Sequence, residues 1–493
     1  MDAFTIIYVL TSFLILFTCW SLITSKNSKK LPPGPPKLPI IGNIHQLEKQ
    51  TPHRRLRDLA RKYGPIMHLQ LGQVSTVVIS TPQPAHEILK IQDLSFLDRP
   101  TATTSQIFYY NATNIAFSSY GNYWRQIKKI ATLELLSVKK VRSFFHIREE
   151  ELNHAFKFLD SSSETTINFR DLTIKTVSNI VSRAALGDVS KEREYLVDCA
   201  YAQLRTFNAF HLFNYYPSLS FFNVISGKKA KWMKMHVEVD VILEDILKEH
   251  RSRPRSIHDH EDLLDVLLRV KDSGDLDFPI TDDNIKSIVL EMLTAGTSSS
   301  SMTIEWAFSE MMKNPKIMKK AQSEVRSIVK GNTITEANIQ SMHYMKLVVK
   351  ETMRLHGVPI LLPRLNPVDC VVNGYDIPAK TRVLINSWAC ATDPGSWENP
   401  DSFIPERFEN SSISYAGSDF EFLPFGAGRR MCPGMNFGLG TVEYVIANLL
   451  YHYDWKLPNG VKPQDVDMRE ITGISTLPIN PLQIVPISIS ERN

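Results

Sequence analysis

The sequence has few cysteines, and no two of them have the close spacing of a metal-binding or redox pair. Five cysteines in 493 residues are an odd number, lie far apart and form no CxxC pair. This argues against a disulfide framework and against a structural zinc site, and it indicates a reducing compartment. The cysteines are Cys19, Cys199, Cys370, Cys390 and Cys432.

The sequence also lacks a strong net charge and a recognisable internal linker. The formal net charge is only +4 and the basic residues are dispersed, so we expect no nucleic-acid partner. No Gly/Ser-rich or highly charged stretch divides the chain, and no repeat is visible in it. Hydrophobic residues make up 43% of the chain and charged residues 22%, which is ordinary for a globular protein with a sizeable core. We therefore expect one large domain.

The N-terminus carries a long apolar run. Residues 3 to 23 are 21 residues without a charge, close to the ~20 that cross a bilayer as a helix. Asp2 precedes the run, and Lys26, Lys29 and Lys30 follow it, which places the remaining chain on the cytosolic side. We expect residues 1 to 25 to form a single-pass membrane anchor, with a buried core helix as the alternative.

A basic and proline-rich segment, residues 26 to 43, follows the apolar run. Its second part, LPPGPPKLPIIGN at residues 31 to 43, contains five prolines, which prevent a helix and hold the chain extended. We expect a stiff hinge between the anchor and a domain that comprises residues 44 to 493, with a flexible linker as the alternative.

The domain itself is expected to be mainly α with a small β region. Thr281 is a candidate N-cap, and a helical pattern runs from it to Lys313, where Asn314 and Pro315 end it. Short strand-like runs bounded by turn residues occur at residues 75 to 80, 370 to 379 and 382 to 388.

The lone Cys432 lies in a glycine-rich stretch, FLPFGAGRRMCPGM at residues 422 to 435. A thiolate that binds a haem iron needs no second ligand nearby in sequence, because the porphyrin supplies four donors. Glycines let the backbone approach the macrocycle, and exposed N–H groups can donate to the sulfur. Arg430 would then pair with a haem propionate, and Phe425 would shield the thiolate. The alternative is a small buried hydrophobic cysteine.

The stretch FGAGRRMCPG resembles the haem-binding loop FxxGxRxCxG of the cytochrome P450 superfamily. Four further elements occur in the order of that superfamily: WRQIKK at 124 to 129, AGTSSS at 295 to 300, ETMR at 351 to 354 and PERF at 405 to 408. The anchor, the hinge and the stretch DPGSWENPDSFIPERF at residues 393 to 408 resemble plant microsomal members that oxidise terpenoids and alkaloids.

The resemblance implies the cytochrome P450 fold, haem b, and a place on the endoplasmic reticulum membrane with the catalytic domain facing the cytosol. It implies dioxygen as the oxidant and electrons from NADPH through the flavoprotein NADPH–cytochrome P450 reductase, with cytochrome b5 as a further candidate partner. Monooxygenase-type oxidation of a bulky apolar plant metabolite, such as a terpenoid or an indole alkaloid, is the function it implies. Hydroxylation, epoxidation and oxidative cyclisation or desaturation all remain open.

The resemblance also assigns roles to individual residues. Cys432 would bind the iron, and the other haem contacts would be Trp124, Arg125, Lys128, Arg364, Phe425, Gly428, Arg430 and Gly434. Glu351, Arg354 and Arg407 would form a buried structural cluster, while Ala295, Gly296, Ser298 and Ser299 would form the catalytic turn. Candidate pocket residues are Phe108, Phe117, Phe207, Phe210, Leu293, Val358 and Leu477.

Three positions depart from the usual pattern of the superfamily. Lys128 stands where arginine is usual, so a point charge replaces a bidentate fork toward the propionate. Gly357 stands alone where relatives carry two prolines, so we expect an unusual pocket wall there. Ser298 and Ser299 replace the usual acid and threonine, which together supply protons for the cleavage of dioxygen.

Ser298 has no accessible proton equilibrium near neutral pH. Glu291 and Glu305 lie on the same helix face, but each is about 10 Å away along the axis. Serines can bond back to the carbonyl four residues earlier and so loosen the turn. We expect a proton relay through water and a bias toward oxidative cyclisation or desaturation, with ordinary hydroxylation as the alternative.

Two other classes of protein remain open from the sequence. One is a thiolate-haem isomerase or dehydratase that uses neither dioxygen nor a reductase. The other is a non-catalytic haem-binding membrane protein. Dependence of turnover on NADPH and reductase separates the first from a monooxygenase, and substrate-dependent consumption of NADPH excludes the second.

Overall fold

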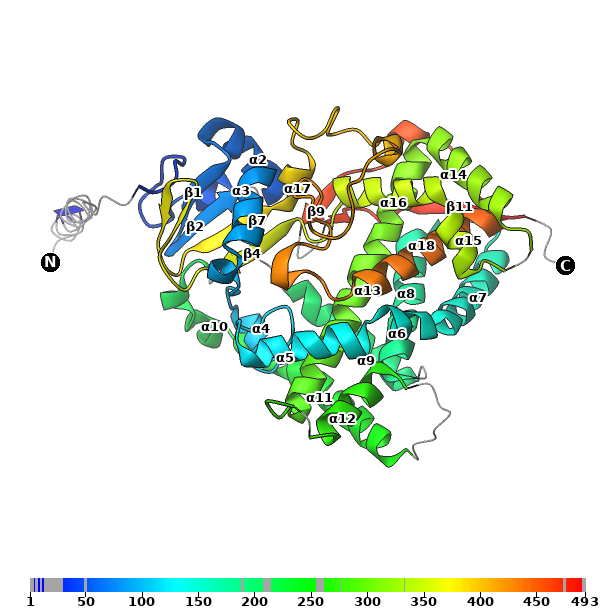
Figure 1. Ribbon diagram of the computed structural model, residues 1–493, viewed down its shortest axis with the longest axis horizontal. Helices are drawn as coiled ribbons and strands as arrows, with labels where there is room; N and C mark the ends of the chain where they lie inside the picture. The colour runs from blue at the N-terminus through cyan, green and yellow to red at the C-terminus, as the bar shows by residue number, and fades with distance from the viewer. Residues whose placement is uncertain are drawn as a thin grey trace.

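The computed structural model shows a helix-rich body with a small sheet at one side (Figure 1). It describes residues 30–47, 51–187, 190–206, 214–253, 261–274, 276–331, 333–472 and 476–489, together with the isolated positions 4, 8, 11 and 12. The predicted architecture, mainly α with a small β region, is confirmed. Most of the expected anchor, residues 1 to 25, lies outside the described residues. Within the described part of the chain, no helix is both long and apolar enough to cross a membrane.

The helices and strands follow one another as a mixed α and β chain. The helices are α2 Pro52–Tyr63, α3 Pro82–His86, α4 Thr103–Phe108, α5 Asn122–Ile130, α6 Val138–Ser143, α7 Phe145–Ser161, α8 Phe169–Leu186, α9 Lys191–Thr206, α10 Phe222–Ile225, α11 Lys228–Ser252, α12 Leu263–Asp272, α13 Asp282–Lys313, α14 Pro315–Ile328, α15 Glu336–Ser341, α16 His343–Leu355, α17 Ser387–Ala391 and α18 Met435–His452. The strands are β1 Ile66–Leu71, β2 Val74–Ile79, β3 Ile167–Asn168, β4 Leu361–Leu365, β5 Cys370–Val372, β6 Tyr375–Ile377, β7 Arg382–Asn386, β8 Tyr453–Lys456, β9 Glu470–Thr472, β10 Thr476–Pro478 and β11 Gln483–Ser488.

The long helix α13 crosses the middle of the body (Figure 1). The Thr281 hydroxyl accepts a hydrogen bond from the backbone N–H of Asn284 at 3.2 Å, which caps the helix as predicted. Pro315 starts the next helix directly after Asn314. Helices α8, α16 and α18 pack against α13, so most of its residues are buried and it forms the centre of the hydrophobic core.

The four-stranded sheet has the order β1-β2-β7-β4. Strands β2 and β7 pair in parallel, whereas the other two pairs are antiparallel. The strand-like runs predicted from the sequence correspond to β2, the β5–β6 pair and β7 in the structure. Strand β4 was not predicted, because it contains Pro363, and proline usually argues against a strand. The sheet tolerates Pro363 because β4 lies at its edge.

The proline-rich segment packs against β1. The N–H of His68 donates to the carbonyl of Pro33 at 2.8 Å, and the N–H of Asn43 donates to the carbonyl of Gln70 at 2.6 Å. A Cβ on Gly34 would lie 2.0 Å from the His68 carbonyl oxygen, so only glycine fits this contact. Residues 33 to 43 therefore have a fixed place on the body.

Candidate active site

The loop that carries Cys432 turns tightly between a short helical turn at Gly428–Arg430 and α18. The backbone N–H of Cys432 donates to the carbonyl of Phe425 at 2.9 Å. Gly428 has a φ of +68°, and a Cβ there would lie 2.4 Å from the Leu89 carbonyl oxygen. The loop therefore requires glycine at this position, both for its conformation and for its approach to the neighbouring backbone.

Asp93 fixes this loop from a distant part of the chain. Its buried carboxylate accepts hydrogen bonds from the backbone N–H of Arg429 at 3.2 Å and from the Arg429 guanidinium at 3.0 Å. Sequence analysis did not identify Asp93, because it lies far from the cysteine in sequence and in no motif. Only the packing of the Asp93–Phe96 turn against the loop brings them together.

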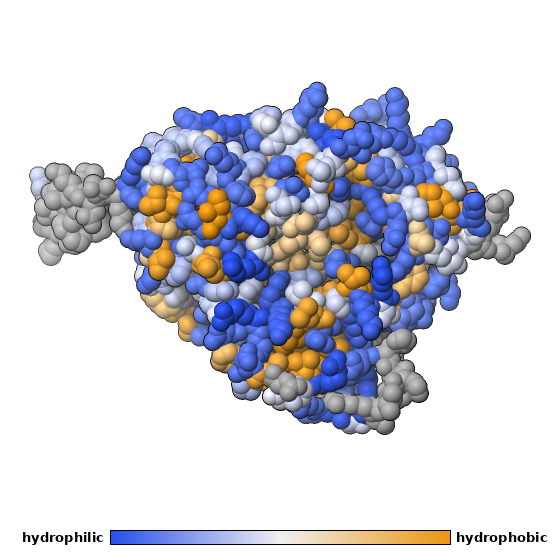
Figure 2. Space-filling model, in the orientation of Figure 1, coloured by the Kyte–Doolittle hydropathy of each residue, from blue (hydrophilic) through white to orange (hydrophobic). Residues whose placement is uncertain are grey.

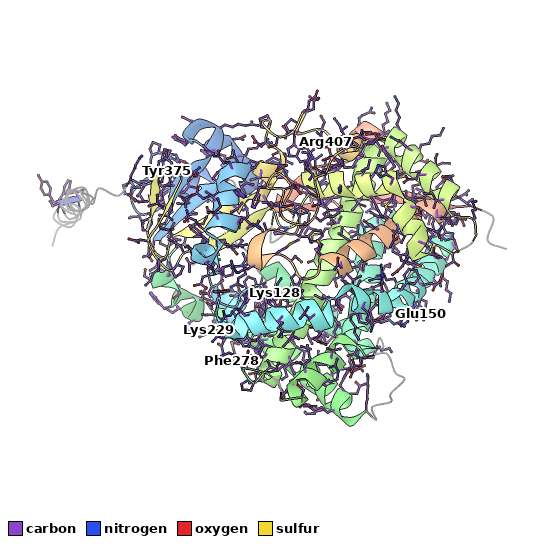
Figure 3. All side chains as sticks on the ribbon, viewed as in Figure 1. Lys128, Glu150, Lys229, Phe278, Tyr375 and Arg407 are labelled. Carbon is purple, nitrogen blue, oxygen red and sulfur yellow. The ribbon has the colours of Figure 1, made fainter. Side chains whose placement is uncertain are left out.

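The Cys432 thiol lies deep in the protein and still retains accessible surface. Burial is the main cause that raises its pKa, while the N–H of Gly434 and the charge of Lys128 act in the opposite direction. The Lys128 ammonium reaches from α5 toward the loop and donates to the carbonyl of Met431, next to Cys432 (Figure 3). Burial lowers the pKa of Lys128 to about 8. Lys128 thus places a positive charge beside the accessible thiol of Cys432.

Two arginines meet near the loop, of which Arg364 is buried and Arg99 is partly buried. Arg99 and Arg364 both donate to the carbonyl oxygen of Pro363, the latter at 3.2 Å. Within the described chain, the Nε atoms of both side chains are buried without a hydrogen-bond partner, and neither guanidinium forms an ion pair. Burial lowers the pKa of both, with the charge of Arg430 as a further cause, and that of Arg364 falls to about 10. Sequence analysis predicted Arg364 but not Arg99, which lies in no motif.

Arg430 completes this group of cations. Its guanidinium donates to the carbonyls of Leu97 at 2.9 Å, Ile115 at 3.2 Å and Ser118 at 2.6 Å. It also lies over the Trp124 ring at 4.3 Å from the centroid. In this structure its donors are therefore engaged with backbone, and it contributes positive charge to the group.

The other predicted haem contacts lie in different surroundings. Trp124 is buried and its indole N–H donates to Ile115, whereas Arg125 is exposed on the outer side of α5 and donates to Asn122. Phe425 is partly buried with its ring edge-on to Tyr415. The structure thus brings Trp124 to the group of cations, and it places Arg125 away from it.

These residues fit a haem. The Cys432 thiolate would bind its iron, and the Nε donors of Arg99 and Arg364, which lack partners within the described chain, would bind its two propionates. Like charges brought together in the interior are costly unless anions pair with them. The group of cations and the lone thiol are therefore explained together by one dianionic cofactor.

The predicted catalytic turn lies in the middle of α13. Ala295 and Ser299 keep accessible surface, while Ser298 is buried. The Ser299 hydroxyl donates to the carbonyl of Ala295 at 2.7 Å, which is the back-bond expected from the sequence. Helix α13 nevertheless runs as α-helix through this turn, and Gly296 packs against Val181.

Neither Glu291 nor Glu305 is free to replace the missing acid. Glu291 accepts hydrogen bonds from the N–H groups of Ile115 at 2.7 Å and Ala116 at 2.8 Å, and burial raises its pKa to about 7. Glu305 pairs with Arg170 at 2.8 Å. The observed contacts agree with the expectation that neither acid reaches Ser298 directly.

The predicted structural cluster is present and buried. The Glu351 carboxylate pairs with Arg354 at 2.7 Å and with Arg407 at 3.0 Å. Arg354 also donates to the carbonyls of Ala391 at 2.8 Å and Pro400 at 2.7 Å. The cluster therefore joins α16 to the long segment that follows α17 and includes Arg407 (Figure 3).

The candidate pocket residues divide into three groups. Phe108 and Leu293 are fully buried in the hydrophobic core. Phe117, Val358 and Leu477 keep accessible surface. Phe207 and Phe210 lie outside the described residues.

Gly357 has a steric reason to be glycine. A Cβ at this position would lie 2.7 Å from the carbonyl oxygen of Met353 in α16. The departure from the usual two prolines therefore coincides with a tight turn at the end of that helix.

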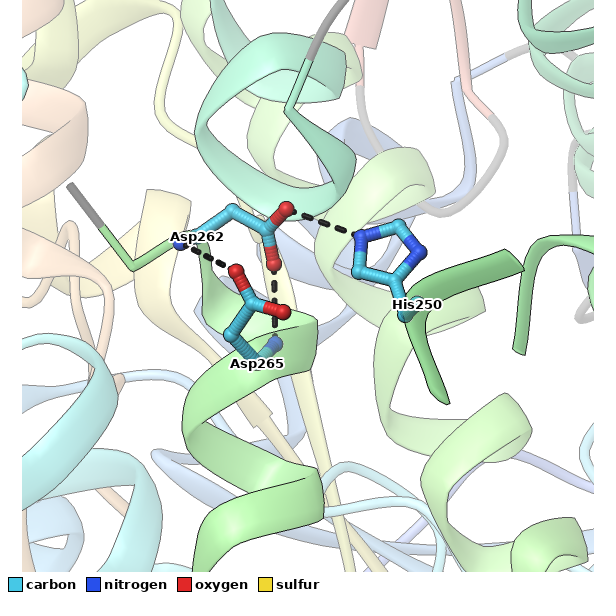
Figure 4. Close-up of side chains that lie close together, drawn as sticks. All are labelled: His250, Asp262 and Asp265. Atoms are coloured by element: carbon cyan, nitrogen blue, oxygen red, sulfur yellow. Dashed lines mark hydrogen bonds and ion pairs between the residues drawn. The ribbon is translucent and has the colours of Figure 1, made fainter. Parts of the chain in front are cut away.

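A second cluster of ionisable groups joins α11 to α12 (Figure 4). His250 Nε2 contacts the Asp262 carboxylate at 2.9 Å, and Asp262 caps α12 by accepting from the N–H of Asp265 at 2.8 Å. His250 Nδ1 contacts the carbonyl of Ile246 at 2.8 Å, so both ring nitrogens face acceptors. Burial lowers the pKa of His250, but the Asp262 contact outweighs it and the net shift is upward. This cluster is explained as a helix cap and an ion pair.

Fold and site together define a haem-thiolate protein. A model of the Cytochrome P450 family matches residues 32–485. The chain is 74% identical over 491 residues to a germacrene A acid 8-beta-hydroxylase of Helianthus annuus, with 100% of each chain covered. It is 62% identical over 488 residues to a costunolide synthase of Cichorium intybus, with 99% of each covered. A zebra fish cytochrome P450 structure with abiraterone matches 89% of this chain and 99% of that chain, with 22% identity and a TM-score of 0.77.

The chain belongs to the cytochrome P450 family. It is an oxidoreductase of the monooxygenase type that uses haem b, dioxygen, a hydrophobic substrate and electrons from NADPH through a reductase. The predictions of family, enzyme class and cofactor are thereby confirmed. The alternative of a reductase-independent isomerase or dehydratase gains no support, since these relatives are named a hydroxylase and a synthase.

Proposed function

We propose that this enzyme oxidises a sesquiterpenoid and that germacrene A acid, hydroxylated at carbon 8, is its first candidate substrate. The observation that carries this proposal is 74% identity, over the whole chain, to a germacrene A acid 8-beta-hydroxylase. The broader expectation of a bulky apolar terpenoid agrees with it. An indole alkaloid is the less favoured class, because the most similar relatives reported above bear terpenoid names.

The chain contributes a defined set of tasks to this reaction. When bound, the haem supplies the activation of dioxygen. Cys432 would hold the iron, while Arg99 and Arg364 would hold the propionates and Arg430 would add positive charge beside them. Ser299 keeps accessible surface in the α13 turn, where its hydroxyl donates to the Ala295 carbonyl and can accept a hydrogen bond from water. A proton would reach the site through such water, and the hydroxyl would have to turn away from Ala295 to pass it on.

Oxidative cyclisation is the second candidate outcome. It is favoured by the costunolide synthase, which is 62% identical to this chain, and by the serine pair at Ser298 and Ser299. The two outcomes differ in product and are therefore separable by chromatography.

The direct test is turnover of germacrene A acid by the enzyme reconstituted with an NADPH–cytochrome P450 reductase. We expect a type I spectral shift on binding and a hydroxylated acid as the main product, formed only with NADPH and reductase. A panel of terpenes and indole alkaloids serves as the comparison. Tight binding of indole alkaloids or fatty acids without binding of the acid would refute the proposed substrate.

We also infer that the enzyme resides on the endoplasmic reticulum membrane, with residues 1–25 as its anchor, residues 26–43 as a hinge and residues 44–493 in the cytosol. An exposed apolar surface supports this proposal. Ile40 is 73% exposed, and its carbonyl accepts from the Tyr216 hydroxyl, while Ile225 of α10 is 72% exposed. Figure 2 shows apolar side chains on the side of the molecule where Figure 1 places β1, β2 and α10.

Redox partners would dock at the face that carries α5 and the cysteine loop. Lys129 and Arg429 are exposed there, whereas Lys128 turns inward to the Met431 carbonyl. Lys129 and Arg429 are therefore suited to bind an acidic surface of the reductase. Cytochrome b5 is a further candidate for the same face.

A further inference from the structure

A two-stranded hairpin, β9 Glu470–Thr472 and β10 Thr476–Pro478, lies beside α13. Leu477 pairs with Ile471 across the hairpin, so both side chains point to the same face. Ile471 is 46% exposed and Leu477 is partly exposed. On the opposite face, Glu470 and Thr476 are buried. The hairpin thus has one anchored face and one open apolar face.

Trp306 of α13 holds the hairpin through one hydrogen bond. Its indole N–H donates to the carbonyl of Thr476 at 3.1 Å, directly before Leu477. The indole is fully buried and stacks on the His356 ring, with 4.0 Å between centroids and 7° between planes. His356 in turn contacts the Glu310 carboxylate at 2.8 Å. Because the ring is held on its face, the direction of its N–H is fixed.

A buried ion pair holds the other end of β10. The Arg170 guanidinium donates to the carbonyl of Pro478 at 2.6 Å and to the Glu305 carboxylate at 2.8 Å. The second oxygen of Glu305 accepts from the N–H of Leu482 at 3.1 Å. Glu305 is almost completely buried, and charge-assisted contacts of this kind are stronger than neutral ones.

Strand β9 is tied to a different part of the body. The Glu470 carboxylate contacts His53 Nε2 at 3.0 Å and also pairs with Arg54, both in α2. Burial raises the pKa of Glu470, but these two partners outweigh it and lower the pKa to about 2. The hairpin is therefore held between α2 on one side and α8 with α13 on the other.

The anchor on α13 is related to the candidate active site by helix geometry. Trp306 and Ser299 are seven residues apart, which is close to two full turns, so they share a face of α13. Their separation along the axis is about 10 Å. The hairpin is therefore attached to α13 on the helix face that carries Ser299, about two turns away from it, and Leu477 directly follows the attached residue.

We propose that Trp306 and the Arg170–Glu305 pair are positioning residues that set how far Leu477 and Ile471 extend over the substrate site. They touch neither haem nor substrate. They act by fixing the backbone of β10, and so decide which bulky ligands fit and which carbon is presented for oxidation. The proposal concerning product rests on the function proposed above, whereas the proposal concerning ligand fit does not.

The first variant is Trp306→Phe, which keeps an aromatic ring against His356 and removes the N–H donor. Its matched control is Trp455→Phe, which removes an indole N–H that donates to the Leu449 carbonyl at 3.0 Å in another part of the core. The probes are imidazole, a small haem ligand, and 4-phenylimidazole, a bulky one. Their dissociation constants are measured from the spectral shift of the ferric enzyme.

We expect Trp306→Phe to change the dissociation constant of 4-phenylimidazole about fivefold, the effect of one ordinary hydrogen bond, and to leave that of imidazole unchanged. Trp455→Phe should change neither. With germacrene A acid, Trp306→Phe should also alter the product ratio and increase the NADPH consumed per product. A merely structural role would affect both ligands, or haem content, alike.

Arg170→Lys is the second variant, because one ammonium group keeps the charge but cannot reproduce the planar fork that reaches both Glu305 and Pro478. We expect the same selective change for 4-phenylimidazole. If the ratio of the dissociation constants for 4-phenylimidazole and imidazole is the wild-type ratio in both Trp306→Phe and Arg170→Lys, the inference is overturned. If the wild-type enzyme fails to oxidise germacrene A acid, the proposed substrate is refuted. The comparison of imidazole and 4-phenylimidazole binding would still decide whether Trp306 and the Arg170–Glu305 pair are positioning residues.

Discussion

Arg99 and Arg364 donate to the same carbonyl oxygen, that of Pro363, although both side chains are cationic and their Nε atoms are buried. Two like charges brought together in the interior repel each other unless an anion separates them. Their Nε atoms, which lack partners within the described chain, indicate where that anion binds. We therefore propose that this arrangement binds the haem propionates.

Replacement of Arg99 tests this assignment. Arg99→Gln should accelerate transfer of haem to apomyoglobin about tenfold, because one charged donor to a propionate is lost. Arg125→Gln is the control, since Arg125 is exposed and bonds to Asn122. Equal haem transfer from the two variants would contradict the role of Arg99.

The Glu351 cluster should control formation of the folded, haem-loaded enzyme. Glu351→Gln leaves Arg354 and Arg407 without their carboxylate and should cost about 3–5 kcal/mol of unfolding free energy. The expected result is loss of the thiolate-shifted absorption band of the reduced carbon monoxide complex. A normal band at the wild-type yield would show that the cluster does not support the cysteine loop.

Acid should weaken the anchor of the hairpin. Because the folded pKa of Glu470 is lowered to about 2, its contribution to stability is complete above its unfolded pKa and is lost as the pH falls through the folded value. The contribution is about 3 kcal/mol near neutral pH, from an unfolded pKa of about 4.3. His53 and Arg54 are the charged or titratable groups that face it, and Arg57 acts on His53.

The measurement for Glu470 is urea unfolding of the wild type and of Glu470→Gln. The difference between them should be largest at about pH 7 and should narrow below about pH 4. Glu194→Gln, at an exposed position, is the control. A difference that does not change with pH would mean that the carboxylate charge is irrelevant to the anchor.

The serine pair should limit the efficiency of proton delivery. In the variant Ser298→Asp/Ser299→Thr, the acid and alcohol of the usual pair are restored, so the product formed per NADPH should rise. The share of hydroxylated product should also rise relative to cyclised product. An unchanged product distribution and unchanged coupling would show that the two serines are a tolerated substitution.

The local features of the site were predictable from sequence, because their residues are close in the chain. The Cys432 loop is recognised from its glycines and arginines, and α13 from its cap at Thr281 and its stop at Pro315. The Glu351–Arg354 pair is separated by three residues of one helix, so its geometry follows from the helix itself.

The remaining features depend on tertiary packing that no local pattern records. Arg99 and Asp93 are single charged residues outside any motif, and they become functional candidates only when β4 and the cysteine loop lie against them. The outward direction of Arg125 was missed, because the motif does not specify which face of α5 each basic residue occupies. Strand β4 was obscured by Pro363, which only the edge position in the sheet makes acceptable.

Reconstitution of the enzyme with reductase, NADPH, isotopically labelled dioxygen and germacrene A acid tests the central claim most directly. We predict one labelled oxygen atom in a hydroxylated product from the wild type, and no product from Cys432→Ala. A product formed without NADPH, a product without labelled oxygen, or turnover by Cys432→Ala would contradict it.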